Sequence, residues 1–233
     1  MFSRLLTSGL FAGAAAGLIA AVLQLYFVQP VLLHAELYEA GDLVHFGATA
    51  TVAADQDLGG IDLVRDGLSI VFTMLVYSGY AMVLVSLMSV AESRGAVING
   101  RTGLLWGTAG FVAVHLAPGF SLAPEVPGAA AADITLRQYW WFATVACAGG
   151  AMWLAAFGKS WMAWSVAVIL LLAPHIYGAP QPDVFTGPVP TELGALFAAR
   201  ALGVGLAAWV MVGGFAGYFW SRQTGASDIR QTV

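Results

Sequence analysis

The stretch Leu170–Arg200, LLLAPHIYGAPQPDVFTGPVPTELGALFAAR, decides the fold of this chain. An apolar run reaches Pro174, a loop with four further prolines follows, and a second apolar run begins after Glu192. Proline ends or kinks a helix because it has no amide donor and collides with the preceding turn. The stretch therefore predicts a helix, a rigid loop and a second helix.

An earlier part of the chain repeats this pattern. It consists of HLAPGFSLAPEVPG (115–128), a charged segment, and RQYWWFATVACAGG (137–150). The tripeptide Leu-Ala-Pro and the dipeptide Ala-Pro each recur 56 residues later, at 116–118 and 172–174, and at 123–124 and 179–180. Two matches at one spacing indicate an internal repeat. A looser third copy is expected in the first hairpin, where Pro30 and His34 follow the first helix and Arg65 opens the second.

Composition places the chain in a membrane. Hydrophobic residues make up 59% of the 233 residues and charged residues 9%, whereas ordinary soluble domains have about 25% charged residues. We therefore expect an integral membrane protein surrounded by lipid, and no nucleic-acid partner. The single cysteine, Cys147, lies inside an apolar run, which excludes a disulfide within the chain and a multi-cysteine metal site.

Six apolar runs reach or approach the length of about 20 residues that crosses a bilayer. We predict an all-α integral membrane protein, a single membrane domain built from parallel helical-hairpin repeats with Pro-rich external loops. The first run is too long for a signal peptide and is expected to be retained. The predicted spans are 5–28, 68–91, 102–118, 138–157, 161–176 and 193–220, with a short amphipathic helix inside an external loop at 31–66.

Charges sort by side when the six spans alternate across the membrane. One side receives six of the nine Lys and Arg residues: Arg4, Arg94, Arg101, Lys159, Arg222 and Arg230. By the positive-inside rule this side is the cytoplasm, so both termini are expected to be cytoplasmic. The other side receives 11 of the 13 acids and all four histidines. Both full repeats then have the same orientation, which allows their Pro-rich loops to meet.

Histidines and carboxylates on the external side are candidate metal ligands. Imidazole suits cobalt, nickel, copper and zinc, and carboxylates complete a site for a divalent ion. A single-helix motif such as HExxH is absent from the sequence, so a site would be assembled from several loops. The alternative is that these histidines only cap helix ends at the interface. The candidate ligands are His34, Glu36, His115, Glu125, His175 and Asp183, with His115 and His175 expected at a shared mouth.

Prolines and arginines near the external ends carry two competing interpretations. Pro118 and Pro174 free backbone carbonyls that could line a cation path, or they only hold rigid turns. Arg137 precedes three aromatic residues, a pattern typical of an anchor at the membrane interface. Arg200 lies about eight residues into the last span, where an unpaired charge is costly. We expect it to pair with a loop carboxylate, with gating as the alternative; the candidate carboxylates are Glu192, Asp183 and Asp133.

Several proline-centred blocks, in this order, resemble the CbtA-type family of proposed cobalt transporter subunits over nearly the whole chain. The blocks are Gln29-Pro30 with Ala35–Glu39, Ala123–Gly128 with Arg137–Trp141, Pro174-His175 with Gly178–Pro182, and Val189-Pro190. The resemblance implies bacterial cobalt uptake linked to cobalamin metabolism, beside a small single-span partner with a histidine-rich metal motif. The family pattern often has a second proline where this chain has Ala123.

These observations favour a non-enzymatic permease subunit of the bacterial inner membrane that admits Co2+ and holds no permanent cofactor. No nucleotide-binding Walker motif occurs in the sequence, so the membrane potential or a partner would supply energy. Two other classes stay open. One is a structural or accessory subunit of a larger membrane complex, and the other is a haem or quinone protein with His115 and His175 as axial ligands.

Overall fold

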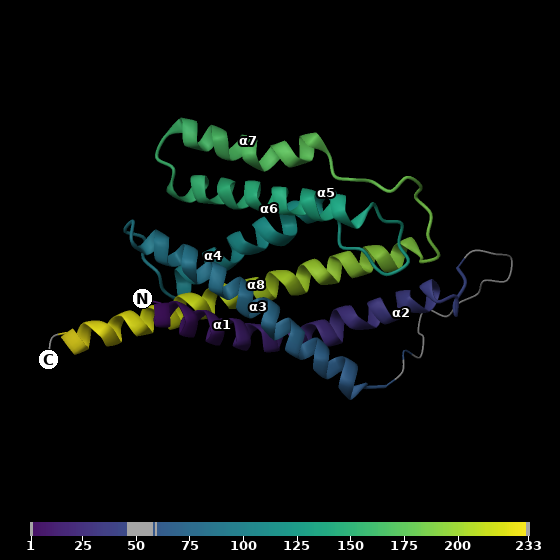
Figure 1. The fold of residues 1–233 in the computed structure, drawn as a ribbon, viewed down its shortest axis with the longest axis horizontal. Helices are drawn as coiled ribbons and strands as arrows, with labels where there is room; N and C mark the ends of the chain where they lie inside the picture. The colour runs from purple at the N-terminus through teal and green to yellow at the C-terminus, as the bar shows by residue number, and fades with distance from the viewer. Residues whose placement is uncertain (1, 46–57, 59, 232–233) are drawn as a thin grey trace. The chain divides into compact units, whose positions relative to one another are not determined.

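A computed structural model describes residues 2–45, 58 and 60–231, with side chains described up to Gln223. These residues form helices and loops, and no strand occurs among them. They divide into two compact units. One comprises Met1–Leu25, Ile61–Phe111 and Val204–Val233, and the other Tyr26–Gly60 and Val112–Gly203. Each unit is described by itself below (Figure 1).

The six predicted spans are confirmed as helical segments. Five are long and apolar enough to cross a membrane, and the sixth, Trp161–Tyr177, has 17 residues. At 1.5 Å per residue that helix is about 26 Å long, slightly less than the hydrocarbon thickness of about 30 Å. The other five are Phe2–Glu39, Leu63–Glu92, Gly100–Ser121, Ile134–Phe157 and Thr191–Gln223. The chain is thus a multi-span membrane protein.

Two prolines that were expected to end helices lie inside them. The first span continues from α1 (Phe2–Leu23) through a π-helical turn, η1 (Gln24–Val28), into α2 (Gln29–Glu39), which holds Pro30. The third span does the same from α4 (Gly100–Phe111) through η2 (Val112–Leu116) into α5 (Ala117–Ser121), which holds Pro118. In both spans the proline is the second residue after the π turn. Proline inside a continuous helix removes one backbone hydrogen bond to the preceding turn, and the π turn coincides with that break.

These π turns revise the predicted repeat. The two turns, and the two prolines that follow them, stand 88 residues apart in both cases. In α7 (Trp161–Tyr177), Pro174 lies inside the helix without a π turn, and Gly178, with φ 95°, ends the helix. The first hairpin was predicted as the loosest copy. Its first helix nevertheless shares more local structure with the copy at 115–128 than α7 does.

The segment predicted at 31–66, with a short amphipathic helix inside it, is helical at both ends. Residues 31–39 belong to α2, and α3 (Leu63–Glu92) begins five residues before the predicted Leu68. The carboxylate of Asp62 accepts hydrogen bonds from the amides of Val64 and Arg65 at 2.9 and 3.0 Å. Such an N-cap satisfies the free amides of a first turn, so the helix can start in a polar sequence. Residues 46–57 of this segment lie outside the described residues.

Glycines set the helix contacts of the first unit. Along α1, Gly9, Gly13 and Gly17 lie against Met82, Ser78 and Met74 of α3, so the two helices run antiparallel. Along α4, Gly103 and Gly107 lie against Gly213 and Trp209 of α8 (Thr191–Gln231), again antiparallel. Small residues let membrane helices approach until their backbones touch, which increases the van der Waals contact between them.

A charged cluster in the first unit joins two helix ends to the body of α8. The guanidinium of Arg4 lies 3.7 Å from the centre of the Trp220 ring and 3.7 Å from a carboxylate oxygen of Glu92. Trp220 donates its indole N–H to Glu92 at 3.0 Å. Trp220 is 1% exposed. The cluster therefore fastens the start of α1 to the end of α3 and to α8.

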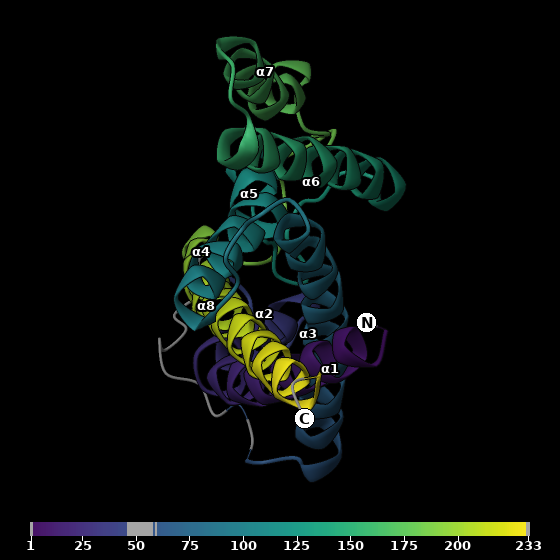
Figure 2. The same ribbon diagram turned by 90° about the vertical axis from the view of Figure 1, so that its left-hand side faces the viewer.

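In the second unit, α6 (Ile134–Phe157) and α7 lie side by side and antiparallel (Figures 1 and 2). Trp140, near the start of α6, donates its indole N–H to the carbonyl of Pro174, near the end of α7, at 3.2 Å. The residues Ala113, Ala117 and Ala148 form a small buried cluster that joins η2 and α5 to α6. The ends of α5 and α7 therefore meet beside the start of α6.

Candidate functional site

The two Pro-rich loops of the second unit contact each other, as the repeat predicts. A Cβ placed on Gly187 would lie 2.5 Å from the carbonyl oxygen of Gly128, and one on Gly128 would lie 2.9 Å from the side chain of Val189. Val126 and Val189 are buried with Ala35 and Tyr38 of α2. Loops 122–133 and 178–190 and helix α2 thus form one packed cluster.

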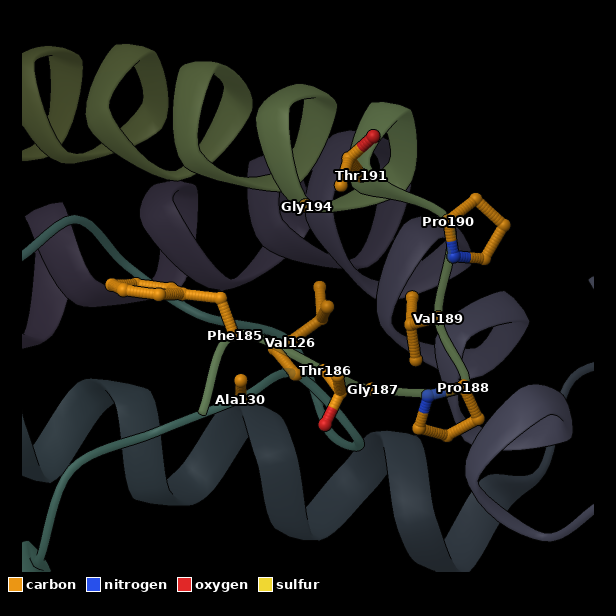
Figure 3. Close-up of a pocket in the computed structure, with 11 residues that line it drawn as sticks. Val126, Ala130, Phe185, Thr186, Gly187, Pro188, Val189, Pro190, Thr191 and Gly194 are labelled. Atoms are coloured by element: carbon orange, nitrogen blue, oxygen red, sulfur yellow. The ribbon is translucent and has the colours of Figure 1, made fainter. Parts of the chain in front are cut away.

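A pocket of about 920 Å³ lies along this contact (Figure 3). It is lined by Val126, Ala129 and Ala130, by residues 185–190 and by the start of α8. Phe185, Pro188 and Val189 are among the side chains around it. No acidic, basic or imidazole side chain of the described residues lines it. The pocket therefore offers apolar surface, hydroxyl groups and backbone, and the candidate metal ligands lie elsewhere.

His175 is the most firmly held of the predicted ligands. Its Nδ1 lies 2.8 Å from Oγ of Ser121, the last residue of α5. The rings of Phe120 and Trp140 stand nearly edge-on to the imidazole, with centroid distances of 5.4 and 5.9 Å. Its Nε2 makes no hydrogen bond within the described part of the chain. The ring is fixed on one edge and has its second nitrogen available.

His115 lies in the π turn η2, six residues before Ser121 on the same helical segment. At 1.5 Å per residue this places its backbone about 9 Å further from the loops than the end of α5. π turns occur often at functional sites because they re-aim side chains within a helix. The structure thus places the two histidines at successive depths of the second unit.

The remaining predicted ligands do not form a ligand group with His175 among the described residues. His34 packs on Tyr38 within α2, with ring centroids 5.6 Å apart, and its Nε2 has no hydrogen-bond partner in the described residues. Glu36 is exposed on the same helix, and Asp183 is exposed in the loop 178–190. Among the residues that the structure describes, no three His, Cys, Asp or Glu side chains form a group able to hold a metal ion.

Glu125 contacts an arginine. Its Oε2 lies 2.7 Å from Nη2 of Arg137, at ion-pair distance, and the side chains of Arg137 and Glu125 are 23% and 25% exposed. The pair connects loop 122–133 to the first turn of α6, where Asp133 caps the helix by accepting from the amides of Thr135 and Leu136. Arg137 was expected to anchor the chain at the interface, and in the structure it also orders this loop.

Within the described part of the chain, Arg200 does not pair with a loop carboxylate. Its Nη1 donates to the carbonyl oxygen of Phe27 at 3.0 Å, and no ion pair of Arg200 is present among the described residues. Glu192, one of its predicted partners, is exposed and accepts a hydrogen bond from Thr191. Phe27 belongs to the π turn η1 and lies three residues before Pro30. The arginine therefore finds its acceptor in the helix backbone.

Ser121, Trp140 and the carbonyl of Phe27 were missed by the sequence reasoning. None belongs to a recognisable metal or catalytic motif. The 56-residue repeat held an indirect signal, since it matches Pro118 with Pro174 and so suggests that the helix ends carrying Ser121 and His175 lie in equivalent places.

Comparison with known proteins gives one match. The sequence model of a family described as "Probable cobalt transporter subunit (CbtA)" matches residues 2–221, nearly the whole chain. No curated protein and no solved structure matches the chain.

Proposed function

The chain belongs to the CbtA family of probable cobalt transporter subunits, and from this premise we propose that it is an inner-membrane permease subunit for uptake of Co2+. The family description concerns a transporter subunit, so the chain acts with a partner. The partner that we propose is a small single-span protein with a histidine-rich segment, which would deliver the ion. Uptake would serve cobalamin synthesis.

The proposed direction of transport is inward, from the side of the Pro-rich loops. The Lys and Arg distribution supports this side as external, with both termini in the cytoplasm. Entry of a cation into a negative interior is favoured by about 2.3 kcal/mol per charge per 100 mV, and so by about 4.6 kcal/mol for a divalent ion. The membrane potential is therefore sufficient to drive uptake.

The observation that carries the proposal is the placement of His175 and His115. His175 lies near the loop end of α7, with Nδ1 bound to Ser121 and Nε2 available. His115 lies about 9 Å deeper along η2 and α5. Conduction requires sites that bind an ion firmly enough for entry and weakly enough for exit, and single ligands at successive depths meet this need better than one closed cage. We assign His175 to ion entry and His115 to the next step.

Uptake of radioactive Co2+ by cells that express the chain with its neighbouring gene products tests the proposal. Loss of a group that only supports a metal ligand costs about 10- to 100-fold in affinity, so His175→Ala should raise the half-saturating Co2+ concentration by about 100-fold or more. His115→Ala should mainly lower the maximal rate. Amounts of folded protein in the membrane should match the unmodified chain. Unchanged uptake by the double variant across Co2+ concentrations would contradict the proposal.

An accessory role is the second candidate, because the family description concerns a subunit. In that case the chain would hold a partner in place without contacting the ion. Both histidine variants would then transport Co2+ normally whenever the complex assembles. Deletion of the chain would abolish uptake by dispersing the partner, which co-purification would detect.

A further inference from the structure

Ser121 differs in what its hydroxyl contacts from the serines of this chain that bond to their own helix. In the helices, Ser78 and Ser165 donate to the carbonyls of Met74 and Trp161, four residues earlier, at 2.7 and 3.0 Å. This back-bonding is the usual solution for serine inside a helix. Ser121 has no such bond in the described structure, and its Oγ lies 2.8 Å from Nδ1 of His175, 54 residues along the chain. Its hydroxyl is therefore directed at the imidazole.

Two aromatic rings stand beside the imidazole in this contact. Phe120 and Trp140 have interplanar angles of 83° and 68° to it. Trp140 is 6% exposed, and its indole N–H is bound to the carbonyl of Pro174, the residue before His175. With Nδ1 beside Ser121, Nε2 is left for another partner.

We propose that Ser121 is a positioning residue that sets the proton of His175 so that Nε2 can bind the transported ion. A neutral imidazole carries one proton, and only the nitrogen without it binds a metal. Metal-binding histidines usually donate the other N–H to an acceptor, which fixes the tautomer and the ring. A serine hydroxyl can fill that role because it accepts as well as donates. This proposal rests on the role of His175 in the proposed function.

Ion binding at His175 needs no further reactant to supply or remove a proton. In the ion-free protein, Nδ1–H of the neutral imidazole donates to Oγ of Ser121, which leaves the lone pair of Nε2 unprotonated. Co2+ can bind that lone pair without any proton transfer. The number of protons on the imidazole is unchanged, and no heavy atom of the contact needs to move.

Metal binding to the full chain in lipid nanodiscs tests this inference. Equilibrium dialysis with Co2+ measures affinity for the unmodified chain, Ser121→Ala, Ser121→Thr, His175→Ala and the control Ser165→Ala. We expect Ser121→Ala to weaken binding by about 10- to 100-fold. Ser121→Thr, which keeps the hydroxyl, and Ser165→Ala, whose hydroxyl contacts only its own helix, should bind as the unmodified chain does.

Nitrogen NMR of the four histidines, with Zn2+ as a diamagnetic probe, gives a readout that stability does not affect. The His175 signals should show Nδ1 protonated and Nε2 bound to Zn2+. An unprotonated Nδ1 in the Zn2+ form overturns the inference even if Ser121→Ala fails to fold. Loss of Co2+ binding in His175→Ala with normal binding in Ser121→Ala overturns it too, while leaving the proposed function intact. Normal Co2+ binding in His175→Ala contradicts both this inference and the role of His175 in the proposed function.

Discussion

At the scale of single residues, the loop end of the second unit is organised by contacts between side chains and partners on different segments. Ser121 reaches His175 and Arg137 reaches Glu125, while Arg200 reaches the carbonyl of Phe27. Two of these residues were candidate metal ligands from their chemistry alone. Their contacts distinguish these two candidates. Glu125 already has a cationic partner, Arg137, whereas Nε2 of His175 has no hydrogen bond among the described residues.

The Arg137–Glu125 pair should contribute to stability. Its side chains are about one quarter exposed, so its strength should fall between that of surface and buried pairs. We expect Glu125→Gln to lower the free energy of unfolding by about 1 to 3 kcal/mol. A double-mutant cycle with Arg137→Gln, measured by thermal unfolding in detergent, isolates the pair. Asp183→Asn, at an exposed loop carboxylate, serves as the control. A coupling energy near zero would contradict this prediction.

Arg200→Leu should destabilise the protein less than breaking a buried ion pair. The replacement removes one charged hydrogen bond to a carbonyl, worth about 1.5 to 3 kcal/mol, and leaves no carboxylate unpaired among the described residues. Arg200→Lys keeps a cationic donor and should recover part of this loss. Thermal unfolding measures both variants. A loss above about 3 kcal/mol, typical of a stranded buried charge, would point to a carboxylate partner instead.

At the scale of elements, glycines bring helices into close contact, and π turns interrupt the regular α-helical geometry of two spans. The face formed by Gly9, Gly13 and Gly17 packs closely against α3. A second close contact joins α4 and α8, where Gly103 and Gly107 lie against Gly213 and Trp209. The glycines of this contact are spread over two distant segments of the chain. The π turns likewise have no sequence motif of their own, although the proline that follows each one is visible.

Alanine at Gly107 should loosen the contact between α4 and α8. Its Cβ would lie 2.9 Å from the carbonyl carbon of Trp209 and 3.1 Å from the Cα of Val210, and backbone cannot give way as a flexible side chain can. We expect a loss of about 1 to 3 kcal/mol in the free energy of unfolding. Gly149→Ala is the matched control: nothing lies within 4 Å of its Cβ, and alanine favours a helix. Equal unfolding temperatures for the two variants would refute the close approach of these two helices.

At the scale of the whole molecule, membrane orientation decides what the site can do. The Pro-rich loops and His175 act on an incoming ion only if they face outward. The packing of Val126 and Val189 against Ala35 and Tyr38 keeps both loops beside α2, so they lie on one side of the membrane together. The distribution of Lys and Arg favours the external side for this cluster.

Single cysteines in a Cys147→Ala background test this orientation. Asp42→Cys and Asp183→Cys should react with an impermeant thiol reagent applied to intact cells. Ser93→Cys, between the second and third spans, should react only after the membrane is permeabilised. Gly187 is unsuitable for labelling, because any side chain there collides with Gly128. The reverse labelling pattern would place the histidines at the cytoplasmic face and end the uptake proposal.

The sequence by itself determined the class and the six helical spans. It could do so because span length and proline geometry are local properties of the chain. Only the tertiary structure decided which polar groups meet. Arg200 and Phe27 are 173 residues apart, and Ser121 and His175 are 54 residues apart. Their contacts depend on which helices pack against each other and on where π turns rotate a helix. No short stretch of sequence predicts either the choice of helix partner or the place of a π turn. For the same reason the chemistry of the proposed ligands could be predicted, whereas their partners could not.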